Sequence, residues 1–275
     1  MRHITLLTDF GTTEGEHTVI KGVIWRILPG ASIADLSHDI SPQNIREAAL
    51  VLERTAHYFP AETVHVVVVD PGVGTERRAI AARFGDQFFV GPDNGVCTPL
   101  LERAERAERE NSPIEIVHLN KPEYWLDDVS DIFHGRDVFA PCGGHLAKGV
   151  PLAKLGSPIT EVVRYHVPRP IFKGDVLHGE VMHIDHYGNI IANMRRDDIE
   201  PMRPVDVWLS GCQIGGLART FGERAPGGLL ALYSPMYYLM IAVTNGNAAA
   251  ELGARVGDPV QVNRMRKPQL DGGEA

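Results

Sequence analysis

The stretch VHVVVVDPGVGTERR, residues 64–78, decides the predicted fold, because an unbroken β-branched run ends there in a carboxylate and a glycine-rich turn. The valines at 66–69 fit a strand that is buried on both faces, as in a parallel sheet covered by helices. Asp70 then stands at the carboxyl end of that strand. Open α/β sheets place their ligand crevices at this edge.

Arg77 follows Asp70 by seven residues, with Arg78 beside it. Between Asp70 and Arg77, the glycines Gly72 and Gly74 favour a tight turn with positive φ. A carboxylate and a guanidinium on one short loop are suited to a reactive centre. The alternative is that Asp70 caps its own turn beside solvated arginines, and the spacing alone does not decide between the two.

The sequence around this stretch alternates strand-like and helix-like segments. Residues 4–7 and 32–36 predict short strands, and the apolar spacing over 17–27 predicts a helix. Another helix is predicted to open at Ser41 and Pro42. This β/α order predicts an α/β domain with a doubly wound, mainly parallel sheet.

The pattern changes near Pro168 and Pro170, which predict a linker. Beyond it, helical periodicity gives way to short strands broken by glycine, which is typical of a small all-β barrel. We therefore predict an α/β N-terminal domain over 1–167 and a β-barrel C-terminal domain over 172–265.

Polar residues in three other segments are candidates for a site. Asp9 is a second carboxylate at the end of a predicted strand and can face the same crevice as Asp70. His134 lies beside a glycine before a predicted helix, although a lone histidine is more often structural. Asp185 and Asn189 can bind a ligand's amino group or simply hold a turn, and from the residues alone the turn is favoured.

Composition argues against several classes of function. The formal net charge of −8 and the scattered arginines give no support to nucleic-acid binding. The 3 cysteines are widely separated, and no Walker A, GxGxxG or HExxH motif occurs, so the signatures of phosphate-binding loops and of common zinc sites are lacking. The first ten residues lack the pattern of a signal peptide, and no apolar run approaches the roughly 18 residues of a membrane span, so we expect a cytoplasmic protein.

Six motifs in chain order carry a resemblance to a known family. They are LLTDFG (6–11), SHDISPQNIREAA (37–49), VVDPGVGTERR (68–78), PDNG (92–95), FHGRDVFAP (133–141) and IDHYGN (184–189). Together they resemble the S-adenosylmethionine hydroxide adenosyltransferase family. Its members are adenosine-forming S-adenosylmethionine hydrolases, once listed as a domain of unknown function and related to the fluorinase and chlorinase enzymes.

This resemblance implies an α/β domain followed by a β-barrel domain, in agreement with the change of pattern near residue 170. It also implies a homotrimer that holds the substrate between the N-terminal domain of one subunit and the C-terminal domain of its neighbour. The implied reaction is hydrolysis of S-adenosylmethionine to adenosine and methionine. The family's catalytic triad falls on Asp70, Arg77 and His134.

The resemblance further implies which residues bind the substrate. Asp9 falls on the position that binds the ribose hydroxyls, and Asp185 and Asn189 fall on those that meet the amino acid group of methionine. Phe133 falls among the substrate-binding positions, and Tyr187 lies where an aromatic residue flanks the ligand. S-adenosylmethionine is the substrate itself, so no cofactor is expected.

Two departures from the family keep other functions open. The related halogenases carry a tyrosine at the position of Asp70, and a carboxylate there would repel a halide. Gly135, however, matches the small residue of the chlorinases, so halide-dependent adenosyl transfer remains an alternative. Residues 234–237, SPMY, gain one residue relative to the family's Asn-Ser-x-Gly-Tyr-Leu pattern. This favours as a third possibility a non-catalytic sensor that binds adenosine or S-adenosylmethionine.

Overall fold

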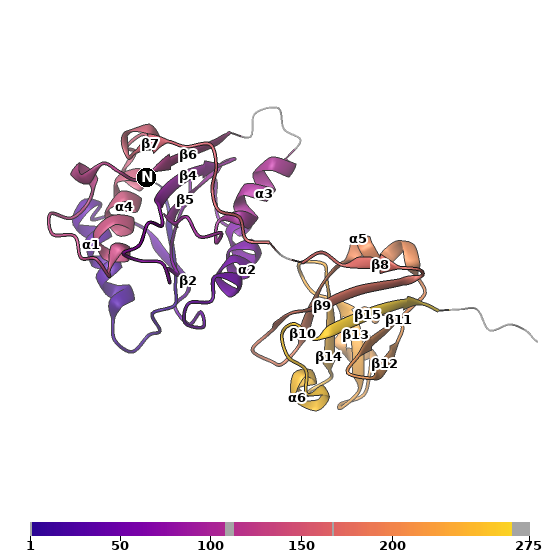
Figure 1. Ribbon diagram of the computed structural model, residues 1–275. Helices are drawn as coiled ribbons and strands as arrows, with labels where there is room; N and C mark the ends of the chain where they lie inside the picture. Colours follow the sequence, from indigo (N-terminus) through magenta and orange to yellow (C-terminus); the bar gives the residue numbers. More distant parts are fainter. Residues whose placement is uncertain (1, 108–112, 167, 266–275) are drawn as a thin grey trace, which may run out of the picture. The chain divides into compact units, whose positions relative to one another are not determined.

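The computed structural model describes residues 2–107, 113–166 and 168–265. Its contacts divide the chain into two compact units, Met1–Tyr165 and His166–Ala275 (Figure 1). Each unit contains its own β-sheet and its own hydrophobic core.

The first unit is built on a seven-stranded sheet in the order β2-β1-β3-β5-β4-β6-β7. Its strands are β1 (Ile4–Thr8), β2 (Ile33–Ser37), β3 (Val64–Val68), β4 (Ala79–Phe84), β5 (Gln87–Pro92), β6 (Ile114–His118) and β7 (Ser157–Pro158). The pairs β1–β2, β1–β3 and β3–β5 are parallel, whereas the pairs from β5 through β4 and β6 to β7 are antiparallel. The parallel half therefore brings the carboxyl ends of β1, β2 and β3 to one edge.

Helices cover both faces of this sheet, as the alternating order predicts (Figure 1). Helices α1 (Glu16–Ile27) and α4 (Ala140–Lys148) pack on one face, and α2 (Ile45–Thr55) and α3 (Thr98–Arg106) pack on the other.

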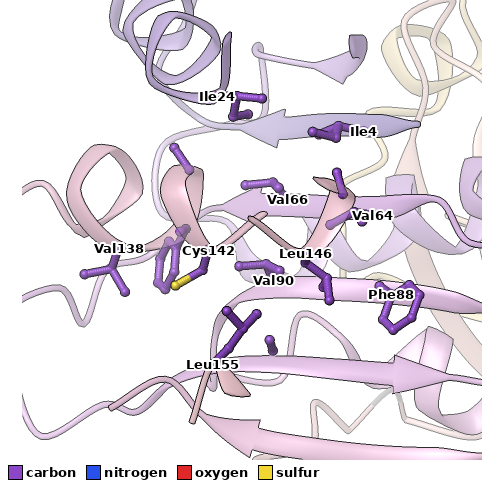
Figure 2. Close-up of a cluster of buried hydrophobic side chains, with 14 of the residues drawn as sticks. Ile4, Ile24, Val64, Val66, Phe88, Val90, Val138, Cys142, Leu146 and Leu155 are labelled. Atoms are coloured by element: carbon purple, nitrogen blue, oxygen red, sulfur yellow. The ribbon is translucent and has the colours of Figure 1, made fainter. Parts of the chain in front are cut away.

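The valine run divides between the two faces because successive side chains of a strand point to opposite sides. Val64, Val66 and Val68 join the core under α1 and α4, whereas Val67 and Val69 join the core under α2 and α3. Figure 2 shows the first of these cores, with Val64 and Val66 among residues of neighbouring strands and helices. The prediction of a strand buried on both faces is confirmed.

Helix α2 begins later than predicted, at Ile45 rather than at Ser41. Gln43 adopts the left-handed conformation, with a φ of 64°, and this breaks the helical path before residue 44. Asn44 then caps the helix, because its side chain accepts a hydrogen bond from the N–H of Glu47 at 3.0 Å.

The second unit is an antiparallel sheet with the strand path β12-β11-β15-β9-β10-β14-β13 and with β8 paired to β9. Its strands are β8 (Ile171–Lys173), β9 (Val176–Ile184), β10 (Ile190–Arg195), β11 (Val205–Leu209), β12 (Cys212–Gly215), β13 (Leu229–Tyr233), β14 (Tyr238–Val243) and β15 (Pro259–Arg264). Ala218, just after β12, donates its N–H to the carbonyl of Ala231 in β13 at 2.8 Å. The two ends of the path therefore approach one another, and the sheet forms the nearly closed barrel that the sequence predicts.

Short helical segments complete the structure. They are η1 (Ala56–Tyr58), η2 (Pro122–Tyr124), the π-helix η3 (Gly135–Phe139), η4 (Leu152–Lys154), α5 (Arg196–Ile199), η5 (Glu200–Met202), η6 (Phe221–Glu223) and α6 (Ala248–Leu252). Within the described ranges, no helix combines the length and the apolar character that a membrane span requires.

His65 in β3 gives the first unit a predictable sensitivity to acid. Its side chain is fully buried, and its Nδ1 lies 2.7 Å from the hydroxyl of Thr5. Burial lowers the pKa of His65 from 6.5 to about 4, so the unfolded chain binds this proton more readily than the folded chain. Stability is therefore lost as pH falls from 6.5 toward 4, by up to about 3 kcal/mol.

Urea unfolding of the parent and of His65→Gln at pH 7 and pH 4.5 measures this contribution. We expect the variant to lose less stability than the parent between the two pH values, because its amide does not titrate. Equal losses in the two proteins would assign the acid sensitivity to other groups.

Candidate active site

Asp70 and Arg77 form a buried ion pair directly after β3. Arg77 donates its Nε to Asp70 Oδ1 at 3.0 Å and its Nη2 to Asp70 Oδ2. The Asp70 side chain is 5% exposed and that of Arg77 is 8% exposed. This two-point contact matches the planar guanidinium to the carboxylate and fixes both side chains.

His134 joins this pair from a distant part of the chain, because its Nδ1 lies 3.2 Å from Nη2 of Arg77. A guanidinium can only donate hydrogen bonds, so Nδ1 must carry the lone pair. The ring is then neutral, with its proton on Nε2. Burial, followed by the charge of Arg77, lowers the pKa of His134 below its ordinary 6.5, in agreement with a neutral ring.

The π-helix η3 and a buried carboxylate hold His134 in place. Asp137 is fully buried and accepts hydrogen bonds from Nε and Nη2 of Arg136 at 2.5 and 3.0 Å and from the N–H of Ser130 at 2.8 Å. A Cβ on Gly135 would lie 2.7 Å from a methyl group of Val68 in β3, so glycine lets this segment approach the strand. The motif HGRD thus places the imidazole at the end of β3.

The ion pair of Asp70 and Arg77 has a raised carboxyl pKa and, within the described residues, one N–H donor without a hydrogen-bond partner. Burial raises the pKa of Asp70 above its ordinary 3.8, and the charge of Arg77 opposes this shift. Arg77 uses Nε and Nη2 for Asp70 and His134, while its buried Nη1 has no hydrogen-bond partner among the residues that the structure describes. A buried N–H without a partner is costly, so this position is suited to a bound water or to an atom of a ligand.

Arg78 faces a different carboxylate from its neighbour Arg77. Its Nε and Nη2 donate to Oδ2 of Asp93 at 2.9 and 2.6 Å, and its Nη2 also donates to the carbonyl of Glu161 at 2.9 Å. Asp93 Oδ1 accepts from the N–H of Val163 at 2.7 Å. Arg78 therefore ties two loops together, and the interpretation in which both arginines are merely solvated is wrong.

Asp9 follows β1 on the loop that leads away from the same edge. Its Oδ2 accepts a hydrogen bond from the N–H of Gln43 at 2.7 Å. The next residue, Phe10, contacts Phe133 edge to face, with ring centroids 5.7 Å apart. The predicted residues Asp9 and Phe133 thus belong to loops that touch, and Phe133 directly precedes His134.

Asp185, Tyr187 and Asn189 form a cluster of their own in the second unit. Asp185 Oδ1 accepts from the N–H groups of Tyr187 and Asn189, both at 2.9 Å, and its Oδ2 accepts from Nδ2 of Asn189 at 2.8 Å. The carboxylate therefore holds the turn between β9 and β10, which was the favoured interpretation from the residues alone. Tyr187 remains 74% exposed on this turn.

The turn between β13 and β14 contains the segment that departs from the family pattern. Ser234 donates its N–H to the carbonyl of Tyr238, and Tyr237 donates its N–H to the carbonyl of Ser234, both at 2.8 Å. Tyr237 has a φ of 60°, although it is a bulky residue, whereas the family pattern has glycine directly before its tyrosine. The altered sequence still closes a tight turn.

Sequence interpretation missed the residues that support the site, namely Asp137, Thr8, His38 and Gln43. All of them lie inside or beside the quoted motifs, but their types are equally common in turns, so the sequence held no signal for their partners. Among the described residues, no three His, Cys, Asp or Glu side chains gather as metal ligands.

Two domain models of one known protein family match this chain in order. The model of the SAM hydroxide adenosyltransferase N-terminal domain matches residues 4–156, and that of the corresponding C-terminal domain matches residues 179–261. The chain is 37% identical over 262 residues to the (R)-S-adenosyl-L-methionine hydrolase of Salinispora tropica, covering 94% of this chain and 97% of that protein. It is 36% identical over 268 residues to the enzyme of the same name from Thermus thermophilus, covering 95% of this chain and 100% of that protein.

A more distant relative and a solved structure also match almost the whole chain. A fluorinase of Nocardia brasiliensis is 26% identical over 294 residues, covering 94% of this chain and 96% of that protein. The crystal structure of an uncharacterised conserved protein from Thermotoga maritima superposes with a TM-score of 0.86 at 35% identity, covering 95% of this chain and 100% of that chain. Since both domain models match in order and the named relatives align along almost the whole chain, this protein belongs to the SAM hydroxide adenosyltransferase family.

Proposed function

We propose that this protein hydrolyses S-adenosyl-L-methionine to adenosine and L-methionine by attack of an activated water on the ribose C5′. The observation that carries the proposal is the contact of Asp70, Arg77 and His134 at the carboxyl end of β3. The family membership and the hydrolase name of its relatives support the same reaction. Because those relatives act on the (R) form, we propose the (R) sulfonium as the substrate.

The substrate contributes much of the driving force for this reaction. The sulfonium sulfur takes the bonding electron pair when the bond to C5′ breaks, so methionine leaves as a neutral thioether. Water is a weak nucleophile, and the protein must therefore orient it in line with the breaking bond and remove its proton. The water oxygen forms the new bond to C5′ and becomes the 5′-hydroxyl of adenosine.

Asp70 is the proposed base that takes the proton. Burial raises the pKa of its carboxyl toward that of a water proton in the transition state, while Arg77 keeps it ionised before the reaction. The Nη1 group of Arg77, which is buried without a partner in the described part of the chain, can donate to the oxygen as hydroxide character develops. The proton then passes from Asp70 to solvent.

His134 has a different role from that of a second base in this scheme. Its Nδ1 accepts from Arg77, so its free nitrogen, Nε2, carries a proton and can only donate. His134 therefore orients Arg77 from one side and offers a neutral N–H donor to the water or the ribose. Asp9, Phe133, Asp185, Tyr187 and Asn189 are proposed to bind the substrate as the family resemblance implies.

The proposal is tested by incubating the protein with the (R) epimer of S-adenosyl-L-methionine in water enriched in oxygen-18. We expect adenosine and methionine in equal amounts by chromatography, with the label in the 5′-hydroxyl of adenosine by mass spectrometry. A 5′-halo-adenosine formed with added chloride or fluoride would instead support halide-dependent transfer. Tight adenosine binding without any product would support the sensor.

The pH dependence of kcat/KM follows from the two shifted groups. Asp70 must be ionised and His134 neutral, and their pKa values move from 3.8 upward and from 6.5 downward. The Asp70 transition therefore lies above pH 3.8, and the His134 transition lies below pH 6.5. We expect kcat/KM to be flat from about pH 7 to 9 and to fall below about pH 6.5, which initial rates across a buffer series would measure. An acid limb centred above pH 7 would contradict this assignment.

One further property is proposed on the resemblance alone. The protein is expected to form a homotrimer, with the domain over 1–167 of one subunit and the domain over 172–265 of its neighbour completing the site. A location in the cytoplasm is proposed separately, from the sequence alone. Light scattering coupled to size-exclusion chromatography gives the assembly mass. A monomeric mass in an active sample would contradict the shared site.

A further inference from the structure

A polar cluster beneath the Asp9 loop takes no part in the proposed chemistry. It joins Thr8 at the end of β1, His38 just after β2, Asp35 within β2, and His17 and Lys21 of α1. Thr8 is fully buried and His38 is 5% exposed. Burying polar side chains carries a free-energy cost unless they are paired, so the partners of this cluster indicate its purpose.

Both ring nitrogens of His38 have a polar neighbour. Its Nδ1 lies 2.9 Å from the hydroxyl of Thr8, and its Nε2 lies 3.1 Å from Oδ1 of Asp35. The other oxygen of Asp35, Oδ2, contacts Nζ of Lys21 at 2.6 Å. The contact of Nε2 with Asp35 is electrostatic rather than a well-aligned hydrogen bond. A carboxylate favours the proton on Nε2, so Nδ1 accepts from the Thr8 hydroxyl. Burial lowers the pKa of His38 and keeps the ring neutral near pH 7.

A β-bulge brings His38 to this position. Leu6 pairs with Asp35 but Leu7 pairs with Ser37, so β2 contains one extra residue at Leu36. The shift sets His38 level with Thr8 instead of one residue beyond it. Bulges of this kind re-aim side chains and occur often beside active sites. The ring of His17 packs against that of His38, with centroids 4.4 Å apart, and holds it there.

The loop that carries Asp9 is bound to His38 on both sides of Asp9. The Thr8 hydroxyl accepts a weak hydrogen bond from the N–H of Phe10 at 3.4 Å, and the His38 carbonyl accepts from the N–H of Gly11 at 2.7 Å. Farther along the segment that His38 begins, Gln43 donates its N–H to Asp9 at 2.7 Å. Residues on either side of Asp9, and Asp9 itself, are thus held by one segment.

From this geometry we propose that His38 is a positioning residue for Asp9, which it aims at the ribose hydroxyls of the substrate through Thr8 and the loop over residues 8–11. The proposal rests on the proposed function, in which Asp9 binds those hydroxyls. His38 touches neither the substrate nor the reacting atoms in this scheme. It acts by fixing the backbone on either side of Asp9, while the N–H of Gln43 binds Oδ2 of Asp9 and leaves Oδ1 for a hydroxyl donor.

Calorimetry with two nucleosides tests the proposal without relying on turnover. Adenosine carries the ribose hydroxyls and 2′,3′-dideoxyadenosine lacks them, so the ratio of their Kd values reports the contact made by Asp9. We expect the parent to prefer adenosine by about 10–100-fold, as for a hydrogen bond to a charged group. In His38→Leu this preference should shrink by about 10-fold, with the affinity for dideoxyadenosine unchanged.

Three variants separate positioning from general damage. His38→Asn keeps an acceptor at the position of Nδ1 and should restore most of the preference. Thr8→Val removes only the hydroxyl and should reduce the preference even if His38→Leu does not fold. Replacement of the exposed His57 by leucine should leave both affinities unchanged. In an Asp9→Asn background, His38→Leu should have no further effect, since both changes act on one contact.

The outcomes are distinguishable from those that test the reaction. A parent that neither binds adenosine nor hydrolyses S-adenosylmethionine overturns the proposed function, and the role of His38 with it. If the parent discriminates between the two nucleosides, and His38→Leu and Thr8→Val discriminate equally well, only the role of His38 is overturned. Equal weakening of both nucleosides in these variants also overturns it, because that is the result of a purely structural defect.

Discussion

Asp70→Asn is expected to lower kcat by about 10²–10⁴-fold, the usual contribution of a general base. The amide has nearly the shape of the carboxylate but cannot take the proton of the attacking water. Its NH₂ group would also face a guanidinium that only donates hydrogen bonds. The effect should fall mainly on kcat, because the proton moves only in the transition state. Adenosine release measured by chromatography at saturating S-adenosylmethionine gives this value.

The adjacent ion pair supplies a matched control for this variant. Arg78 and Asp93 also form an arginine–carboxylate pair, in which the Asp93 side chain is 1% exposed, and Arg78 donates to the carbonyl of Glu161 rather than to His134. Asp93→Asn should lower the melting temperature, because it leaves a partly buried guanidinium without its partner. It should keep kcat within a few-fold of the parent. If Asp70→Asn released adenosine as fast as Asp93→Asn, Asp70 would not be the base.

The two arginines also show where sequence interpretation stops. Arg77 and Arg78 have the same residue type and almost the same local sequence, yet one joins Asp70 and the other joins Asp93. Which carboxylate each arginine binds depends on the side of the turn from which its side chain projects. For Arg77 it also depends on His134, which lies 57 residues away along the chain. The resemblance to the family, and not the spacing, singled out Arg77 in advance.

The sheet was predictable because its signal is periodic and local. The valine run divides between two cores as alternation requires, and the aspartates after β1 and β3 stand at strand ends as the pattern indicates. The bulge at Leu36, the left-handed Gln43 and the π-helix after His134 were not predicted. Each of them departs from a regular element, and such departures are fixed by tertiary contacts rather than by local propensity.

Gly74→Ala is expected to separate the catalytic loop from the segment that carries His134. Gly74 has a φ of 74°, and a Cβ built there would lie 2.5 Å from the backbone carbonyl oxygen of Asp131. A backbone atom cannot rotate away, so the loop over residues 70–77 must move. The contact of Arg77 with His134, now 3.2 Å, would be lost. A displacement of about 1 Å can cost roughly 10²-fold in rate, and we expect kcat to fall by about that factor.

The strain of placing alanine in a left-handed conformation must be separated from the steric clash. Gly149, at the end of α4, has a φ of 107°, and no atom lies within 4 Å of the position that its Cβ would occupy. Gly149→Ala therefore carries the conformational penalty of about 1 kcal/mol without the clash, and should lower the melting temperature while leaving kcat unchanged. Gly74→Ala adds overpacking of about 1–3 kcal/mol and the loss of rate. Since both variants place alanine at a positive φ, the difference between their kcat values measures how far catalysis depends on the approach of the two loops. Equal kcat values would mean that the loop of Asp70 and Arg77 keeps its geometry without this close contact.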